Sequence, residues 1–437
     1  MGDRRDGFVP HVLAYHASRD LVPLYSVYAL LFADHGVDSG RISLLFIIWA
    51  LTSFVCEVPS GAWADTFDRR RLLVLSAGIY AAGFAGWMVW QTFAGFAVGF
   101  MCWGLSSALM SGTFESLVYD ELVERGARGR YAALIGWAQS TALVANLAAS
   151  AAAAGLFHLG GYALVGWTSV AIAGVQGLLA ATLPVSYRAR HAPHEEGAVA
   201  ATEHAAIRYV AMLRAGLSES ARHPDVRRVL LLTSAMVAMT AYDEYFPLVA
   251  RDHGVSTTIV PVLVAITVVG QAVGTALVGR TARWSGRSVA AALAVGSVLI
   301  SVGAVVTPYA GFVAIAVGYG LCNNAMLVGE TRLQDSISGP ARATVTSVLG
   351  VLEDLSAIAL FACFAVGSRV LGFPELVALL AGPAFLVALA VARWLPAPRH
   401  VREAGDKAGD VADDGEDDGE GGGEGGVEDS AVEVSES

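Results

Sequence analysis

The tetrapeptide Asp34-His35-Gly36-Val37 follows the first long apolar segment of the chain and recurs, letter for letter, as Asp252-His253-Gly254-Val255. The two copies begin 218 residues apart, at positions 34 and 252. Further matches follow the same offset, at which Arg69 aligns with Arg287, Gly61 with Gly279 and Ala64 with Ala282. At a slightly smaller offset, Glu115 aligns with Glu330 and Asp120 with Asp335. This self-similarity predicts two copies of one structural unit.

Each copy contains six long apolar segments. A helix needs about 20 apolar residues to cross a hydrocarbon core of about 30 Å. Segments of that length lie near residues 10–33, 41–64, 71–91, 93–119, 131–157, 160–183, 227–250, 256–279, 288–307, 309–333, 343–368 and 373–396. They predict an all-α membrane protein with twelve transmembrane helices. Because six spans return the chain to its starting side, we expect two parallel six-helix bundles, related by an axis along the membrane normal.

The composition excludes a water-soluble globular protein. Of 437 residues, 55% are hydrophobic and 15% are charged, which leaves too little polar surface to face water. The net charge of -11 comes from the segment 403–437, which holds fourteen acidic residues and one Lys. No nucleic-acid partner is expected. The four cysteines lie far apart in apolar segments, so their spacing predicts neither a disulfide framework nor a metal site. No cofactor is expected either.

Arginines mark one side of the membrane. They occupy alternate connections, for example Arg4 and Arg5, the run 69–71, and the trio Arg125, Arg128 and Arg130. Because positive residues favour the cytoplasmic side, both termini and the central loop are predicted to be cytoplasmic. An even number of spans requires the same arrangement. The expected location is the cell (inner or plasma) membrane.

These patterns divide the chain into four parts. The two bundles are expected at residues 1–183 and 226–397. Between them, the cytoplasmic linker 184–225 carries apolar residues at helical spacing, which is typical of an amphipathic helix lying along the membrane surface. The acidic, Gly-rich tail 398–437 cannot bury a core and is expected to be disordered.

The turn after the second apolar segment reads Gly61-Ala-Trp-Ala-Asp65-Thr-Phe-Asp68-Arg-Arg-Arg71, and a weaker copy spans residues 279–287. A Gly, an Asp four positions later and a basic cluster at this place resemble the major facilitator superfamily. With the span count and the repeat, the resemblance covers about residues 10–397. It implies that superfamily's fold and secondary transport.

The chain departs from the family pattern in several places. Asp68 occupies a position where the family usually has Gly, and Thr66 one where the family often has a basic residue. The second copy keeps Gly286 but has Arg283 in place of the Asp of the turn. The segment 131–157 contains no Pro, whereas the family's drug antiporters typically carry a Gly-Pro motif there. This absence lowers the expectation of a drug/proton antiporter.

Charged residues at the cytoplasmic helix ends can form a gate. Asp65 and Arg69 are four residues apart and so are neighbours on a helix. The resemblance implies a gate formed by Gly61, Asp65, Arg69 and Asp120, with Arg287 and Asp335 as counterparts in the second copy. The alternative is that the positive charge only anchors the topology.

Charges inside the apolar segments are few. Each costs about 2.5–3.5 kcal/mol near the bilayer centre, so such residues usually face a cavity. The candidates for a substrate or proton pathway are Arg19, Asp20, Glu115, Asp243, Glu244, Glu330 and Arg332. They lie in the first, fourth, seventh and tenth segments, which line the central cavity in the family that the chain resembles. The competing interpretation is a set of static ion pairs, for example Arg19 with Glu330.

The leading hypothesis is a secondary active transporter that moves a small organic molecule by alternating access. Proton coupling and export are favoured, and a monomer in the lipid bilayer is expected. The alternatives are an uptake permease for an anionic nutrient, with Arg19 and Arg332 as binding cations, or a non-transporting membrane sensor. No phosphate-binding loop of the G-x-x-x-x-G-K-[ST] form occurs, and no spacing of nucleophile and base predicts an enzyme.

Overall fold

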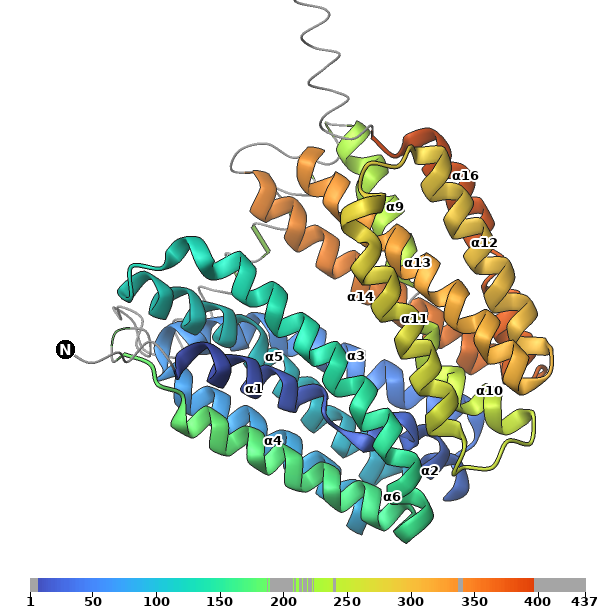
Figure 1. Ribbon diagram of the computed structural model, residues 1–437, viewed down its shortest axis with the longest axis horizontal. Helices are drawn as coiled ribbons and strands as arrows, with labels where there is room; N and C mark the ends of the chain where they lie inside the picture. Colours follow the sequence, from blue (N-terminus) through green and yellow to red (C-terminus); the bar gives the residue numbers. More distant parts are fainter. Residues whose placement is uncertain are drawn as a thin grey trace, which may run out of the picture. The chain divides into compact units, whose positions relative to one another are not determined.

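The computed structural model describes residues 7–186, 224–238, 241–336 and 341–396, with isolated positions between 187 and 223. Residues Met1–Pro396 belong to one compact unit. Every regular element in the described part of the chain is a helix (Figure 1), which confirms the all-α prediction. The acidic tail, and most of the predicted amphipathic helix in the linker, lie outside the described residues.

Seven long helices each correspond to one predicted apolar segment. They are α3 (Ser39–Thr66), α4 (Arg69–Val89), α5 (Phe93–Glu124), α11 (Val260–Thr281), α12 (Gly286–Val305), α13 (Pro308–Ser336) and α14 (Ala341–Gly367). Asp68, one of the departures from the pattern that the chain resembles, has a local role at the start of α4. Its carboxylate accepts a hydrogen bond from the backbone N–H of Arg71 at 3.1 Å, and it thereby caps the start of α4.

Two predicted segments run together in α6 (Tyr131–Thr182), which is 52 residues long. Its backbone leaves the helical conformation at Gly160 and Gly161, where φ is -157° and +57°. A left-handed φ costs an L side chain more than it costs Gly, so Gly161 suits this reversal. The expected boundary between the segments 131–157 and 160–183 therefore coincides with the break in α6.

The first segment of each predicted copy is broken in the same way. Residues near 10–33 form α1 (Phe8–Asp20), the 3₁₀ helix η1 (Pro23–Ser26) and α2 (Tyr28–Asp34). Residues near 227–250 form α9 (Pro224–Ala238), η3 (Ala241–Tyr245) and α10 (Phe246–Asp252). At the 218-residue offset of the sequence repeat, α2 coincides with α10 residue for residue, and η1 starts opposite η3. The repeat thus extends from the sequence to the place where the helices break.

Nine helices in the described part of the chain are long and apolar enough to span a membrane. One of these stretches, Arg128–Thr182, covers both segments of α6, and another, Phe373–Trp394, joins α15 (Phe373–Leu380) and α16 (Ala384–Trp394). The two broken segments are not among the nine, because none of their pieces is long enough. Multiple membrane spans are therefore confirmed, and the number twelve stays a prediction.

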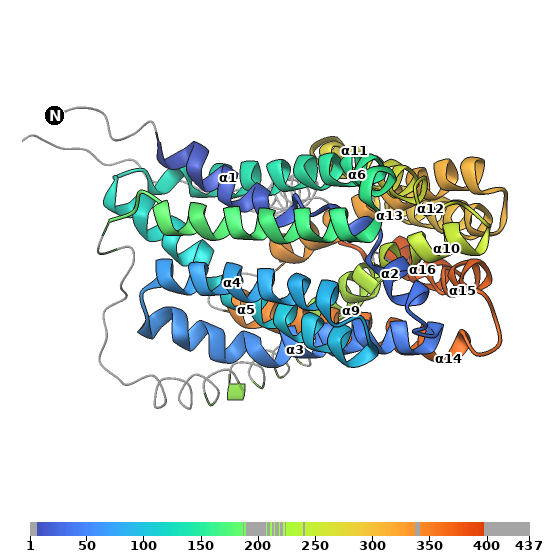
Figure 2. The same cartoon turned by 90° about the horizontal axis from the view of Figure 1, so that it is seen from below.

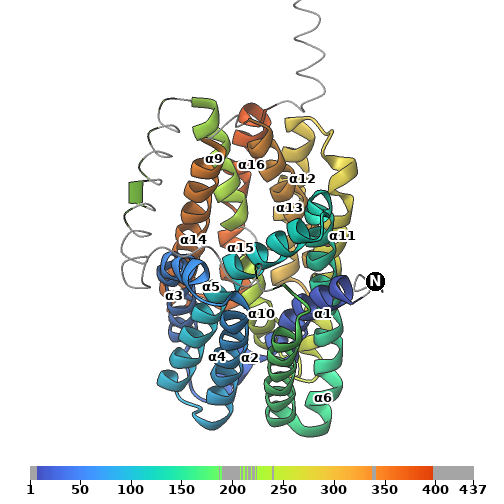
Figure 3. The same ribbon diagram turned by 90° about the vertical axis from the view of Figure 1, so that its left-hand side faces the viewer.

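The helices pack along two sets of contacts. In the first part of the chain, α1, α3, α4, α5 and α6 contact one another in a series, and in the second part α9, α11, α12, α13, α14 and α16 do so (Figure 3). Across the two parts, α3 contacts α14, α6 contacts α11, and α2 contacts α10 (Figure 2). These crossing contacts bring the two broken segments together.

Candidate functional site

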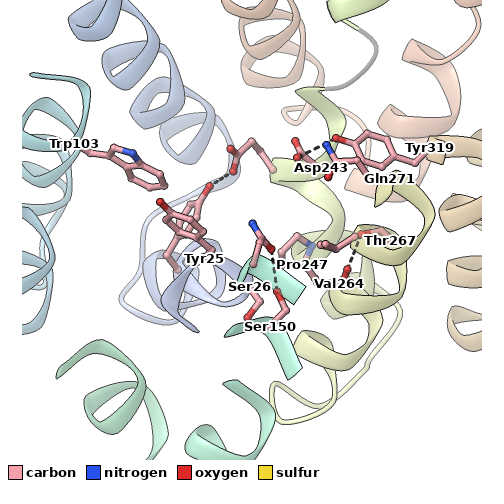
Figure 4. A pocket seen from close by; sticks show the side chains of 14 residues that line it. Tyr25, Ser26, Trp103, Ser150, Asp243, Pro247, Val264, Thr267, Gln271 and Tyr319 are labelled. Atoms are coloured by element: carbon pink, nitrogen blue, oxygen red, sulfur yellow. Dashed lines mark hydrogen bonds between the residues drawn. The ribbon is translucent and has the colours of Figure 1, made fainter. Parts of the chain in front are cut away.

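A hollow of about 180 Å³ lies where the two broken segments meet (Figure 4). Both 3₁₀ helices contribute to its wall, and α2, α5, α6, α10, α11 and α13 complete it. The lining residues are Tyr25, Ser26, Tyr28, Trp103, Asn146, Ser150, Asp243, Glu244, Pro247, Val264, Thr267, Val268, Gln271 and Tyr319. Two of them are carboxylates, and none is basic.

Tyrosine hydroxyls hold the two carboxylates of the hollow. Tyr319 Oη donates to Asp243 Oδ2 at 3.1 Å, and Tyr28 Oη donates to Glu244 Oε2 (Figure 4). Neither carboxylate forms an ion pair with a basic side chain in the part of the chain that the structure describes. The bond from Tyr28 joins α2 to η3, so it links the two broken segments at the hollow itself. Two uncompensated carboxylates can bind a proton or a positively charged group.

Arg19 lies beside the hollow and is buried, with 6% of the residue exposed. Its guanidinium donates to Ser106 Oγ and Ser107 Oγ at 2.8 Å each, and it covers the ring of Tyr80 at 3.7 Å from the centroid. The ion pair with Glu330, the example given for the competing interpretation, is not formed between these two described residues. Arg19 influences the hollow through Tyr25, whose hydroxyl donates to the Arg19 carbonyl at 3.4 Å.

The structure separates the seven pathway candidates. Asp243 and Glu244 are in the wall of the hollow, and the other five are outside its lining. Asp20 follows Arg19 at the end of α1 and is half-buried, Glu115 on α5 is exposed, and Glu330 on α13 is half-buried. The sequence pattern grouped these residues by segment, whereas the wall of the hollow includes only the two that lie in the 3₁₀ helix η3.

Arg332 has a different environment from the one expected. It is 1% exposed, and its guanidinium donates to the carbonyls of Ala282 and Trp284 at 2.8 and 2.7 Å and to the carbonyl of Pro396. It therefore ties the end of α11 to the chain after α16. Arg332 is not part of the wall of the hollow, and its place in a substrate pathway stays a prediction.

At the turn between α3 and α4, the structure brings two of the gate candidates together. Arg69 is 5% exposed, donates from Nε to the Ala64 carbonyl at 3.1 Å, and pairs with Asp120 of α5 at 2.5 Å. Gly61 lies in the last turns of α3. The side chain of Asp65 lies outside the described part of the structure.

The second copy of this turn is held differently. Ala282 is the counterpart of Ala64 at the repeat offset, and its carbonyl is bound by Arg332 from α13. Arg287 and Asp335, the counterparts of Arg69 and Asp120, are both exposed. No ion pair joins them within the described residues, so the predicted copy of the cluster is not assembled here.

On the opposite side of the membrane, side chains link the two parts of the chain. Arg251 Nη1 lies 2.7 Å from Asp34 Oδ1, and Tyr162 Oη donates to Asp34 Oδ2 at 2.6 Å. Asp252, the repeat counterpart of Asp34, instead accepts a hydrogen bond from the backbone N–H of Phe373 at 3.0 Å. Sequence reasoning used Asp34 only as a marker of the repeat and missed this link.

Several lining residues were also missed from the sequence, among them Tyr28, Trp103, Gln271 and Tyr319. One signal was available for part of the wall. The 218-residue offset places Asp243 and Glu244 opposite Tyr25 and Ser26, next to Pro23, and a Pro inside an apolar segment marks a helix break. Nothing in the sequence pattern points to the residues from α5, α11 and α13.

Comparisons with known proteins agree with this architecture. The family model described as Major Facilitator Superfamily matches residues 14–360. No curated protein sequence matches the chain. Similar solved structures include a mutant of the nucleoside transporter NupG, with a TM-score of 0.70 and 12% identity, covering 89% of this chain and 100% of that chain.

Two further structures are similar over the same share of the chain. The human organic anion transporter MFSD10 has a TM-score of 0.59 and 17% identity, with 89% of this chain and 100% of that chain covered. A POT family transporter in complex with 5-aminolevulinic acid has a TM-score of 0.62 and 12% identity, with 89% and 95% covered. At such identities the likeness shows the fold alone.

Proposed function

Because the chain belongs to the major facilitator superfamily and is a multi-pass membrane transport protein, we propose that it is a proton-coupled secondary active transporter that exports a small organic molecule. In this proposal two parallel six-helix bundles alternate around the hollow, with both termini on the cytoplasmic side of the cell membrane. A monomer suffices, because both bundles belong to one chain.

The observation that carries the proposal is the pair of carboxylates where the broken segments meet. Asp243 and Glu244 face a hollow, and no basic side chain in the described part of the chain neutralises them. An uncompensated charge inside a membrane protein is costly, so binding of a proton or a cationic group is favourable there. A proton and a solute that compete for Glu244 cannot be bound together. This competition favours exchange, and an inward proton gradient then drives export.

The hydrogen bond from Tyr28 to Glu244 supports coupling to conformation. It joins α2 of the first part to η3 of the second, on the same segments that carry Asp34 and Arg251. A proton or solute that takes Glu244 must compete with Tyr28 for the carboxylate. Occupancy of the hollow would therefore weaken one of the links between the two parts. A ligand shifts the balance between two conformations only if it interacts differently with each of them, and competition for Glu244 provides such a difference.

The cluster of Arg69 and Asp120 supports a cytoplasmic gate in the first copy. The pair joins the start of α4 to α5, and the Asp120 side chain is partly exposed, so water can help to break it. Topological anchoring by positive charge alone would not require the carboxylate. Arg287 and Asp335 would join such a gate only in another conformation, because they are exposed and unpaired with each other in the described structure.

Uptake of an anionic nutrient is less well supported by the geometry. Its two expected binding cations do not line the hollow. Arg19 donates to two serine hydroxyls, and Arg332 donates to three backbone carbonyls. An anion in the hollow would meet Asp243 and Glu244 instead.

Proton movement in proteoliposomes tests the proposed function. Vesicles with a pH-sensitive dye inside receive external phenyltrimethylammonium, benzyl alcohol or benzenesulfonate, which represent a permanent cation, a neutral solute and a permanent anion of single-ring size. Solute entry by exchange carries protons out, so at least one probe should make the lumen alkaline. Glu244→Gln should abolish this change, whereas Glu375→Gln, at an exposed carboxylate in the first turn of α15, should retain it.

The proposal is wrong if no probe moves protons, or if the Glu244→Gln protein responds as the natural protein does. Acidification of the lumen would mean that solute and proton move together, which contradicts exchange. Equal amounts of folded protein in the vesicles are verified by size-exclusion chromatography before reconstitution.

A further inference from the structure

The wall of the hollow combines negative charge with aromatic rings. We infer that the transported solute is a compact organic cation of single-ring size, bound between the carboxylates of Asp243 and Glu244 and the rings of Tyr25, Tyr28 and Trp103. This inference rests on the proposed transport function and names the substrate class for the same site.

Charge is the first argument. Asp243 and Glu244 each accept a hydrogen bond from one tyrosine, and a tyrosine hydroxyl is neutral. Asp243 is exposed to the hollow and Glu244 is partly exposed, so a solute in the hollow can contact both carboxylates. A charge without a counter-charge is costly inside a membrane protein. The buried guanidinium of Arg19 is outside the lining and donates to Ser106 and Ser107. The missing counter-charge is therefore one that a ligand would bring.

The aromatic wall is the second argument. Tyr25 stacks on Trp103 with centroids 4.9 Å apart and planes at 5°, and Tyr28 meets Trp103 edge to face at 6.0 Å and 84°. These contacts fix the rings before any ligand binds. A cation next to Trp or Tyr rings is attracted by their electron-rich faces, and aromatic sites of this kind bind quaternary ammonium groups. An anion would be repelled by the same faces.

Size is the third argument. The hollow holds about 180 Å³. An apolar cavity of about 150 Å³ accommodates a benzene molecule, and drug-sized ligands need about 300 Å³ or more. One ring with a small cationic group fits these limits, and a molecule with two fused rings and a side chain does not.

Polar side chains in the wall of the hollow would accept a further group on the solute. They include Asn146 and Ser150 of α6 and Gln271 of α11. The side-chain amide of Gln271 forms no hydrogen bond with the described part of the chain, and only its backbone carbonyl is used, by Asn323. A hydroxyl or carbonyl on the cation would therefore find a partner here.

Binding to the purified full-length protein tests the inference separately from transport. Phenyltrimethylammonium, benzyl alcohol and benzenesulfonate are compared by isothermal titration calorimetry and by their effect on the thermal unfolding midpoint. The cation should bind most tightly and raise the midpoint. Its affinity should fall at least tenfold in Glu244→Gln and in Asp243→Asn, remain within threefold in Glu244→Asp, and be unchanged in Glu375→Gln. Protons should compete, so cation binding should weaken as the pH falls.

Tighter binding of benzenesulfonate or benzyl alcohol than of the cation would overturn the inference. Undiminished cation binding by folded Glu244→Gln and Asp243→Asn proteins would also overturn it. Different results would refute proton-coupled transport and the cationic substrate class. Proton movement driven by benzenesulfonate would leave proton-coupled transport in place and refute the substrate class. Cation binding without any proton movement would leave the substrate class in place and refute coupled transport.

Discussion

Arg19 is a buried guanidinium whose partners are neutral. Two serine hydroxyls of α5 accept from its Nη atoms, and the ring of Tyr80 covers it. Hydrogen bonds to a charged group contribute about 1.5–3 kcal/mol each, and a desolvated cation–π contact contributes about 2 kcal/mol. These contacts compensate a charge that an ion pair would otherwise have to neutralise. The Arg19 carbonyl in turn accepts from Tyr25, so the same residue helps to position a wall of the hollow.

Replacing Arg19 by Lys tests this account of the buried charge. A lysine ammonium cannot reach both hydroxyls with the planar geometry of a guanidinium and stacks less well on a ring. We expect Arg19→Lys to lower the free energy of unfolding by about 1–3 kcal/mol. The measurement is thermal unfolding of the detergent-purified protein. Arg41→Lys, at an arginine whose side chain is 63% exposed, should leave the midpoint unchanged. Equal midpoints for both variants would contradict the account.

At the residue scale, the sequence pattern selected charges in apolar segments but did not predict what each of them contacts. Asp243, Glu244 and Arg19 were selected in this way, and the first two line the hollow. Arg332 was grouped with them, although its guanidinium binds three carbonyls near the helix ends. A long, flexible side chain can reach groups a full helical turn away, and residue spacing along one helix does not reveal which neighbouring helix supplies them.

The elements that position the site are two broken helices. Backbone groups released at a break must find partners inside a membrane protein, so such breaks are tolerated where they are buried in protein or line a cavity. Here α1 and α2 are separated by η1, and α9 and α10 by η3, at equivalent positions of the repeat. The apolar runs 10–33 and 227–250 look continuous in the sequence, because Tyr, Ser and Ala are compatible with both helix and break. Pro23 in the first run and Pro247 in the second are the local signals, and both lie beside the breaks.

Arg332 and Arg287 both lie near helix ends, and replacing each of them by Ala should change the free energy of unfolding by different amounts. Arg332→Ala removes a buried guanidinium and leaves the carbonyls of Ala282 and Trp284 without this donor. The free energy of unfolding should fall by about 2–4 kcal/mol. Arg287→Ala removes an exposed side chain of the same type from the start of α12, and the effect should stay within about 0.5 kcal/mol.

Thermal unfolding of the Arg332→Ala and Arg287→Ala proteins in the same detergent measures which substitution lowers stability more. A larger loss for Arg287→Ala than for Arg332→Ala would show that the second copy of the turn is held by the family's arginine position after all. Transport by the Arg332→Ala protein at low temperature should persist, because the residue does not line the hollow.

At the scale of the whole unit, the links between the two parts of the chain differ between its two sides. Asp34 pairs with Arg251, Tyr245 donates to Ser43 at 3.0 Å, and Phe46 packs on Phe361 on the side predicted to be extracellular. On the predicted cytoplasmic side, the pair of Arg69 with Asp120 and the hydrogen bond from Arg332 to Ala282 each join residues of one part of the chain. This asymmetry supports a state in which the outer side is closed.

The repeat and the spans could be predicted from the sequence because each depends on patterns along the chain. The hollow could not be, because it depends on how α5, α6, α11 and α13 pack around the two breaks. Side chains such as Trp103 and Tyr319 acquire their role only from that packing. In apolar helices they are indistinguishable from ordinary core residues.

Alternation between the two parts of the chain is tested most directly by a reversible cross-link on the outer side. Cysteines replace Asp34 and Arg251 in a chain whose four natural cysteines are changed to Ser or Ala, and a short, reducible thiol cross-linker joins them. Each single-cysteine variant serves as the control. Alternation predicts that solute-driven proton movement in proteoliposomes stops when the outer side is cross-linked and returns on reduction. Proton movement at the unmodified rate by fully cross-linked protein would contradict it.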